Sequence, residues 1–382
     1  MINKLSKKDK NKVLFITSSQ HFADMFLRDF LKYLSISYEI HLITNFKHKK
    51  ESYDNIHLYD VSLERKISLS KDLISVIKII YYTLKIKPQY LVTTTPKCTI
   101  FGTIIKLLIP KINRSHIYTG ITWTNMKGLK KLIFKFLDKM NISYCDKVIF
   151  DSKDQITFMV NKKFDKTNFH LIHKGSIKGV DTKTFYKYES KKIIALKQQY
   201  KIPLDVKIIL YLGRLDLDKG ITDLIKAFKL AHKEEKKINL LLVGKDEMQI
   251  NKYLNNLNDA IKNKIIYLDH QKFPEIFFNI ADIFCLPSKR EGFGNVVIES
   301  SSCETPVIGT NIYGLRSSLI NHFNGLVFEV GNVIDLKNKI KLLLKDHGLR
   351  NQLGQNGREF VIKNFKTNDV FNSLEEIIFN NV

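Results

Sequence analysis

The sequence predicts an α/β protein of two doubly wound domains, each with a parallel sheet that helices cover on both faces. Its 382 residues suit two cores of about 150–200 residues better than one. Short apolar, β-branched runs alternate with stretches of helical periodicity, which is the pattern of parallel sheets buried on both sides. The pattern starts twice, at residues 13–17 and again at 207–212. Each start predicts the first strand of a separate domain.

The first half contains strand-like runs at residues 13–17, 38–44, 90–94, 116–118 and 147–151. Helical patterns lie between them, notably at residues 22–34 and 74–86. The first of these helices repeats an apolar side chain every four residues, at Phe22, Phe26, Phe30 and Leu34. We expect these four side chains to form one buried stripe.

The second half repeats the pattern, with runs at residues 207–212, 240–243, 265–268, 283–286 and 307–309 and a helix at 221–232. The polar stretch 182–203 has no strand pattern and predicts the domain boundary. We therefore expect an N-terminal domain over residues 1–182 and a C-terminal domain over 183–366. Residues 367–382 predict a polar surface helix that packs back on the N-terminal domain. Two such Rossmann-like domains would face a central cleft, because ligands bind at the carboxyl ends of parallel strands.

Composition excludes several classes of protein. The four cysteines, at positions 98, 145, 285 and 303, form no C-x-x-C pair, so we expect neither a disulfide framework nor a zinc site. The first twelve residues are charged and lack the apolar core of a signal peptide. No apolar run approaches the roughly 18 residues that a membrane span needs. We expect a cytoplasmic protein.

The net charge of +24 is unevenly distributed, since residues 1–180 contain 32 Lys and Arg against 14 Asp and Glu. One interpretation is a lysine-rich composition that produces solvated surfaces. The other is a basic N-terminal half that meets an anionic partner, either a membrane surface or a nucleic acid.

The segment YLGRLDLDKG, residues 211–220, follows a predicted strand and precedes a helix. Gly213 permits a tight exit from the strand, and Arg214 and Lys219 bring two cations to the loop. A guanidinium fork and a compact ammonium group suit a nucleotide diphosphate. Taken alone, this segment also fits a second interpretation, in which Arg214 and Lys219 are two surface cations on a turn. The chain contains neither a P-loop nor a G-x-G-x-x-G after a strand, which argues against a nicotinamide enzyme.

The segment EGFGNVVIE, residues 291–299, is more specific. It follows a strand at 283–286, and its glycines, Gly292 and Gly294, let backbone amides approach a ligand closely. A helix is predicted to begin near Asn295, and its N-terminus attracts phosphate. Glu299 lies one turn into this helix on the Asn295 side, where its carboxylate can accept hydrogen bonds from ribose hydroxyls. Glu291 is positioned to meet hydroxyls of a donor sugar.

The spacing of these glutamates is similar to the E-x7-E signature of retaining family 4 glycosyltransferases with the GT-B fold. Further segments resemble the same family: GRLDLDKGI, LLLVGKDE, ADIFCLPSKREGFG, CETPVIGTNIYGLRSSL and NGLVFEVGN. In the N-terminal half, IYTGITWTNMKGLKKLIFKFLDK and LIHKGSIKGVDTKTF resemble a bacterial subgroup that builds capsule, O-antigen (lipopolysaccharide) or N-glycan precursors on polyprenyl-diphosphate lipids. The resemblance covers nearly the whole chain and is stronger from residue 182 onward.

The resemblance implies a hexosyltransferase that moves a sugar from a nucleotide diphosphate, a UDP-sugar for preference, to a polyprenyl-diphosphate-linked acceptor. It implies that Arg214 and Lys219 bind the diphosphate, that Glu299 binds the ribose and that Glu291 orients the sugar. The backbone amides of Phe293, Gly294 and Asn295 would hold the distal phosphate or sugar. No cofactor and no metal is expected, because the cations and the helix N-terminus stabilise the leaving phosphates.

The acceptor side carries weaker signals. His116 and Asp151 are candidate helpers of proton transfer, or structural residues. Trp123, the single tryptophan, either lines the acceptor pocket or belongs to the core. The segment 127–141 has an apolar stripe flanked by lysines; it predicts either a core-facing helix or a basic amphipathic helix that binds anionic lipid at the inner face of the membrane.

Two other functions remain open at this point. A nucleic-acid-binding protein would account for the charge, but the lysines are interspersed with apolar core residues and no recognised nucleic-acid-binding motif is present. A GT-B enzyme acting on a soluble substrate, of the epimerase or sugar-phosphate synthase type, would share the fold and the donor site and would not associate with membranes.

Overall fold

The protein forms two compact units in a computed structural model that describes residues 10–46, 53–63, 69–124 and 126–380. Unit 1 comprises Met1–Lys178 together with Asn368–Val382, and unit 2 comprises Gly179–Thr367. Each unit is built around its own parallel sheet. This confirms the predicted α/β fold of two Rossmann-like domains.

Seven strands form the described part of the unit 1 sheet, in the order β3-β2-β1-β4-β5-β6-β7, and every pair is parallel. The strands are β1 Lys12–Ile16, β2 Glu39–Thr44, β3 Ile56–Asp60, β4 Tyr90–Thr94, β5 Asn113–Tyr118, β6 Lys147–Phe150 and β7 Phe169–Leu171. The central strands are buried almost throughout, which is why they read as continuous apolar runs. The short strands β3 and β7 at the two edges are half-exposed, and their sequences therefore do not form continuous apolar runs.

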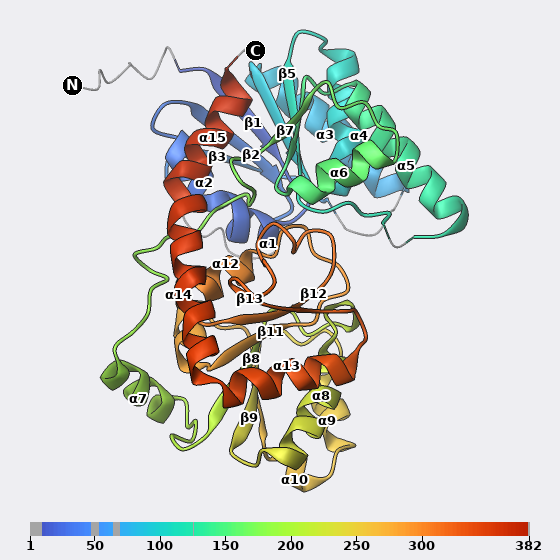
Figure 1. Cartoon of the computed structure of the whole chain (residues 1–382). Coiled ribbons are helices and arrows are strands. Elements are labelled where there is room, and N and C mark those ends of the chain that lie inside the picture. Colours follow the sequence, from blue (N-terminus) through green and yellow to red (C-terminus); the bar gives the residue numbers. More distant parts are fainter. Residues whose placement is uncertain (1–9, 47–52, 64–68, 125, 381–382) are drawn as a thin grey trace, which may run out of the picture. The chain divides into compact units, whose positions relative to one another are not determined.

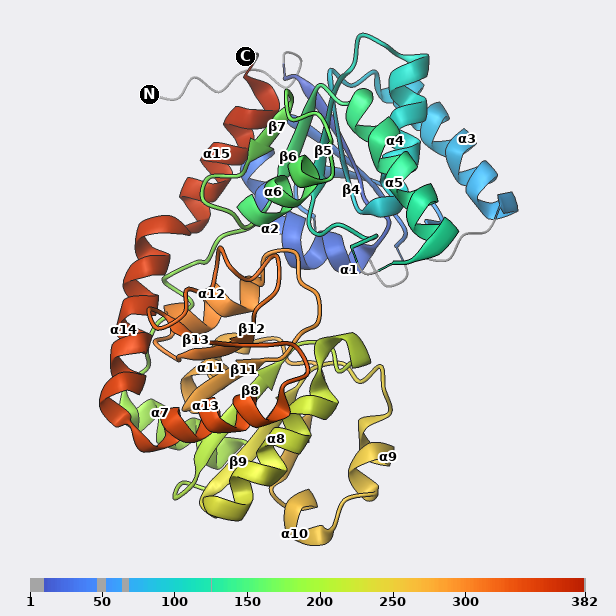
Figure 2. The same ribbon diagram turned by 45° about the vertical axis from the view of Figure 1, so that its right-hand side comes forward.

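The helices of unit 1 lie between its strands in the sequence, except α15, which follows the last helix of unit 2 (Figures 1 and 2). They are α1 Gln20–Phe22, the π-helical turn η1 Ala23–Leu27, α2 Arg28–Leu34, α3 Leu69–Ile86, α4 Pro96–Leu108, α5 Gly128–Ser143, α6 Lys153–Asn161 and α15 Thr367–Phe379. Helix α4 packs against both α3 and α5, and the three helices lie side by side in both views. No helix in the described ranges is long and apolar enough to cross a membrane.

The π-helical turn η1 changes the predicted stripe of the first helix. An i→i+5 turn adds a residue and rotates the following side chains around the helix axis. Phe30 and Leu34 are buried as expected. Phe22 and Phe26, before and within the turn, are half-exposed and contact each other with ring centroids 5.0 Å apart. Ala23 and Leu27 take the buried positions instead.

The C-terminal helix α15 is more than a polar surface helix. Its apolar face, formed by Val370, Phe371, Leu374 and Ile378, is buried in the core of unit 1. The Phe371 ring lies 5.2 Å from that of Phe30. Spacings of one, four and eight residues place these side chains on one side of a helix. The last helix of the chain therefore completes the core of the first unit.

The unit 2 sheet has the described order β10-β9-β8-β11-β12-β13, again with parallel pairs. Its strands are β8 Lys207–Leu212, β9 Ile238–Val243, β10 Ile265–Leu268, β11 Ile283–Leu286, β12 Val307–Thr310 and β13 Gly325–Phe328. Its helices are α7 Ser190–Gln199, the 3₁₀ turn η2 Leu217–Lys219, α8 Ile221–Glu234, α9 Ile250–Asn255, α10 Asp259–Lys262, α11 Pro274–Ile280, α12 Asn295–Ser302, α13 Val333–Lys345 and α14 His347–Asn364.

The stretch 182–203, predicted as a domain boundary, contains helix α7, and the two units divide at residues 178 and 179 instead. At this point the chain runs beside its own return segment. The Val180 amide donates to the Phe365 carbonyl over 2.7 Å, and the Thr367 amide donates to the Val180 carbonyl over 3.2 Å. Gly179 adopts φ +63°, and a Cβ there would lie 2.8 Å from the Phe365 oxygen, which explains the glycine.

Candidate functional site

The strand order of unit 2 brings two loops together. Strands β8 and β11 are neighbours although β9 and β10 separate them in sequence, so the sheet has a topological switch point between them. The loop 213–220 leaves the carboxyl end of β8, and the loop 287–294 leaves that of β11. The Lys289 amide donates to the Asp218 carbonyl over 2.9 Å, so the two predicted motifs are in contact. A switch point is where doubly wound sheets bind ligands.

Gly220 sets the distance between these loops. It adopts φ +69°, in the left-handed region, and links η2 to α8. A Cβ at this position would lie 2.1 Å from the Pro287 carbonyl oxygen, closer than any two such atoms can approach. The absence of a side chain therefore allows the first loop to rest on the start of the second.

The structure pairs two of the predicted site residues directly. The Lys219 ammonium lies 2.6 Å from the Glu291 carboxylate, with side chains 20% and 14% exposed. One residue comes from each loop, so this ion pair joins the two motifs. The pair places a cation and an acceptor of hydroxyl protons side by side at the switch point.

Arg214 has a different carboxylate partner. Its guanidinium donates to Glu247 over 2.7 Å and lies 3.7 Å from Asp216. Glu247 follows β9, the other neighbour of β8, and its amide donates to the Leu215 carbonyl over 2.9 Å. Sequence reasoning missed Glu247. Glu247 is the last residue of the segment VGKDE. It can be recognised as a partner of Arg214 only once β8 and β9 are known to be adjacent.

Tyr211 supports the Arg214 backbone and was also missed. It is buried in β8, and its hydroxyl donates to the Arg214 carbonyl over 2.7 Å. Burial, assisted by the negative charge of Glu291, raises the pKa of Tyr211 well above its ordinary value. The phenol therefore stays protonated and keeps donating at every physiological pH.

The loop 311–318 buttresses the segment 291–299. Gly314 has φ +89°, and a Cβ there would lie 2.4 Å from the carbonyl oxygens of Glu291 and Gly292. The Ser318 hydroxyl donates to the Phe293 carbonyl over 2.8 Å. These two residues fix the path of the glycine loop from behind. Both residues lie in the segment CETPVIGTNIYGLRSSL, which resembles the glycosyltransferase family, but the sequence alone predicted no role for them.

Helix α12 begins at Asn295, as predicted, and Gly294 caps it in a left-handed conformation with φ +78°. Phe293 as a whole residue is only 1% exposed and packs in a core cluster. Glu299 shares a helix face with Asn295 and is 4% exposed. Burial, with a smaller contribution from the charge of Glu299, raises the pKa of Glu275 on the adjacent helix α11.

His116 lies in unit 1, at the carboxyl half of β5. It is 1% exposed and, together with Thr95 and other residues, lines a small pocket of about 20 Å³. Its Nδ1 lies 2.8 Å from the Thr93 hydroxyl oxygen. Burial and the charge of Arg114 hold the pKa of His116 well below its ordinary value, so the imidazole is neutral.

Trp123 and Asp151 are internal residues of unit 1. The Trp123 ring is fully buried, its indole N–H donates to Asp138 over 2.7 Å, and it belongs to a core cluster. Of the two alternatives for Trp123, the structure supports the core position. Asp151 is 2% exposed and accepts from Gln155 over 2.5 Å. Burial raises the pKa of Asp151 to about 7.

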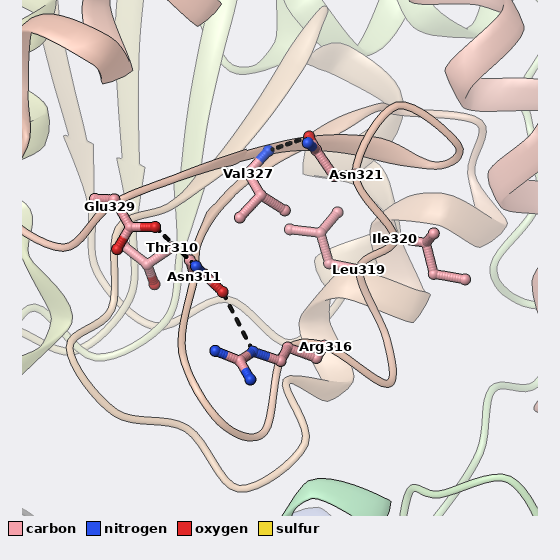
Figure 3. A pocket seen from close by; sticks show the side chains of 8 residues that line it. All are labelled: Thr310, Asn311, Arg316, Leu319, Ile320, Asn321, Val327 and Glu329. Carbon is pink, nitrogen blue, oxygen red and sulfur yellow. Dashed lines mark hydrogen bonds between the residues drawn. The ribbon is translucent and has the colours of Figure 1, made fainter.

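A separate pocket of about 420 Å³ lies beside β12 and β13 (Figure 3). Arg316 donates to Asn311 over 3.2 Å, and Asn311 donates to Glu329 over 2.7 Å across it. None of the predicted donor-binding residues lines this pocket. Among the described residues, no three His, Cys, Asp or Glu side chains gather as a metal-binding group.

Comparison with known proteins identifies the domain that carries the paired loops. Residues 192–360 match the family model described as "Glycosyl transferases group 1". This range contains both the loop 213–220 and the loop 287–294. The GT-B fold and the glycosyltransferase activity expected from the sequence are thus confirmed.

Individual relatives of the chain also have names that describe glycosyltransferases. The chain is 28% identical to the capsular polysaccharide biosynthesis glycosyltransferase CapM of Staphylococcus aureus, over 89% of each chain. It is 28% identical to a Campylobacter jejuni N,N'-diacetylbacillosaminyl-diphospho-undecaprenol alpha-1,3-N-acetylgalactosaminyltransferase, over 61% of this chain and 60% of that protein. Among solved structures, HepE of Anabaena in complex with UDP and glucose superposes with a TM-score of 0.80 at 18% identity, covering 96% of this chain and 98% of that one.

Replacing Gly220 with alanine is expected to force the two loops apart. Gly331→Ala is the matched control, because Gly331 has a similar φ of +79° but no atom within 4 Å of the added Cβ. The control should lose about 1–2 kcal/mol of unfolding free energy from backbone strain alone. Gly220→Ala should lose clearly more, because it adds a clash with the Pro287 backbone. Equal urea midpoints for the two variants would show that the close approach of Gly220 to the Pro287 carbonyl does not exclude a side chain at position 220.

Replacing Asp151 with asparagine tests its burial through pH. The folded carboxyl titrates near pH 7 and the unfolded one near pH 3.9, so between these values the folded state holds a proton that the unfolded state has lost. Stability from this group therefore falls as pH rises through that window. Asp151→Asn should gain unfolding free energy over the wild type between pH 5 and pH 8, up to about 4 kcal/mol. Asp29→Asn, exposed on α2, is the control; a gain independent of pH would refute the assignment.

Proposed function

We propose that this glycosyltransferase, whose residues 192–360 match the group 1 family model, transfers a hexose from a nucleotide diphosphate to a lipid-linked glycan with retention of anomeric configuration. The observation that carries the proposal is the Lys219–Glu291 ion pair at the switch point of unit 2, where the loop 213–220 contacts the loop 287–294 that leads into α12. We further assign the chain to the retaining family 4 enzymes of capsule, O-antigen or related surface-glycan synthesis.

In this proposal the diphosphate exchanges places with carboxylates that already hold the cations. Lys219 and Arg214 turn from Glu291 and Glu247 to the phosphate oxygens, and the amides at Gly294 and Asn295 add hydrogen bonds at the helix N-terminus. Glu291, once released, is free to accept from hydroxyls of the donor sugar. Glu299 accepts from the ribose hydroxyls. A UDP-sugar is the proposed donor, in keeping with the UDP bound by the fold relative HepE.

The proposed chemistry breaks the bond from the anomeric carbon to the diphosphate oxygen and forms one to an acceptor hydroxyl oxygen. The electron pair of the broken bond stays on the departing phosphate, which also takes the acceptor proton. Negative charge therefore grows where Lys219, Arg214 and the start of α12 stand, and these preorganised groups stabilise the transition state more than the ground state. The proposal assigns no step to a metal or to another cofactor.

The proposal for the acceptor rests on the names of two relatives and on the exposed apolar side chains of α5 in unit 1. CapM is named for capsular polysaccharide synthesis and the Campylobacter relative for a diphospho-undecaprenol acceptor. We propose a polyprenyl-diphosphate-linked acceptor reached at the inner face of the cytoplasmic membrane, where the exposed apolar stripe of α5 supports contact with anionic lipid. A soluble acceptor, as in enzymes of the sugar-phosphate synthase type, is the alternative; transfer of labelled sugar into an organic-solvent extract distinguishes the two.

Donor binding is expected to depend on Lys219 and Glu299. A panel of UDP-, GDP- and ADP-sugars should reveal one class that raises the melting temperature of the wild type, since a ligand bound to the native state stabilises it. Lys219→Ala and Glu299→Gln should each weaken that ligand roughly 10- to 100-fold, the effect of losing one charge-assisted hydrogen bond. Binding should not change when a chelator is added.

Lys226→Ala is the matched control, because Lys226 is an exposed lysine on α8 outside the loop. It should bind the donor like the wild type. Unchanged affinity in both Lys219→Ala and Glu299→Gln, with the fold intact, would rule out the proposed donor site.

A further inference from the structure

Helix α3 exposes a row of large apolar side chains that the sequence did not single out. Leu73, Ile74, Ile77, Tyr81 and Leu84 are 55–62% exposed. They recur at helical spacing on one side of the helix, while the opposite side packs into a core cluster. No residue in the described part of unit 1 buries these five side chains.

Helix α5 exposes a similar row. Leu129, Leu132, Ile133 and Phe136 are 49–73% exposed, whereas Asp138, Asn141 and Ile142 on the other side are buried. The sequence had left two interpretations of this stripe, core or membrane. The structure turns most of it outward and fills the inner side with a polar network around Asp138 instead.

The two rows lie on helices that flank a third helix, α4. Helix α4 lies between α3 and α5 and packs against both, as both views of the fold show (Figures 1 and 2). It adds Leu107 and Leu108, which are 52% and 59% exposed. Soluble monomers rarely expose so many large apolar side chains on adjacent elements unless the surface binds something.

The charges around these rows are almost all positive. Lysines flank the apolar positions of α3 and α5 at 71, 78, 85, 87, 127, 130, 131, 135 and 139. Of the carboxylates in α3 and α5, Asp72 lies 2.5 Å from the Lys97 ammonium and Asp138 is buried. The surface is thus an apolar face with a cationic surround, complementary to the headgroups and acyl chains of an anionic bilayer.

We propose that α3 and α5 together bind one anionic lipid surface, each inserting its apolar row at the level of the headgroups. A helix of this kind lies in the plane of the interface with its apolar side about 5–10 Å deep, and each nearby lysine adds attraction to anionic lipid. Association of two copies through this face would bring the same lysines together, so like charges oppose a self-complementary interface.

The inference deepens the proposed function by naming the partner surface and a second helix that contacts it, and it rests on that function for its biological purpose. Its test uses neither donor nor acceptor. Binding of the full chain is measured by co-sedimentation with phosphatidylcholine vesicles and with vesicles that contain about one third phosphatidylglycerol.

The full chain should bind the anionic vesicles and bind the zwitterionic ones far more weakly. Ile74→Ser with Ile77→Ser in α3, and Leu132→Ser with Phe136→Ser in α5, should each reduce partitioning by about tenfold or more, since each removes two inserted side chains. The control pair, Leu204→Ser with Ile334→Ser, replaces apolar residues of unit 2 that are 50% and 58% exposed and should bind like the wild type.

Two outcomes overturn the proposal. One is vesicle binding that the α5 pair weakens and the α3 pair leaves unchanged. The other is a stable dimer, seen by light scattering, that the α3 pair dissociates while no variant binds vesicles. Glu299→Gln should bind vesicles like the wild type, so failure of the donor site and failure of the lipid surface give different results. Unchanged melting temperatures in the serine variants would exclude misfolding.

Discussion

The parallel pairing of β8 with β11 is the constraint on which the candidate site depends. It brings together two loops that lie about 70 residues apart in the chain and sets them against each other through the contact of Gly220 with Pro287. The ion pair of Lys219 with Glu291 then joins one loop to the other. Without this pairing, the cations of the first loop and the helix N-terminus after the second would not belong to one site.

The electrostatics of the site follow from the same arrangement. Each of the two cations predicted to meet a diphosphate already holds a carboxylate, Glu291 for Lys219 and Glu247 for Arg214. The Arg214–Glu247 pair is about one third exposed and therefore contributes little net stability. The Lys219–Glu291 pair is mostly buried, so its separation requires an anion that takes the place of the carboxylate beside the ammonium group. A diphosphate offers more charge and more acceptor oxygens than the carboxylates it replaces. The site therefore favours an anion that contacts both cations at once.

Most of this architecture could be predicted from the sequence. Strands buried on both faces give unbroken apolar runs, so the bounds of β8, β10 and β11 match their predicted ranges. Contacts that depend on strand order could not be predicted, such as Glu247 beside Arg214. Nor could the outward direction of the α5 stripe, because periodicity reveals an apolar side of a helix without showing what covers it. The π-helical turn at Ala23–Leu27 likewise leaves no mark in an apolar repeat.

A crystal structure of the chain soaked with UDP tests the central claim most directly. The account predicts phosphate oxygens within hydrogen-bonding distance of the Lys219 ammonium and of the amides at the start of α12, with the Lys219–Glu291 pair opened and the ribose beside Glu299. A nucleotide bound elsewhere, for example in the pocket between Thr310 and Glu329, with that ion pair still closed, would contradict it.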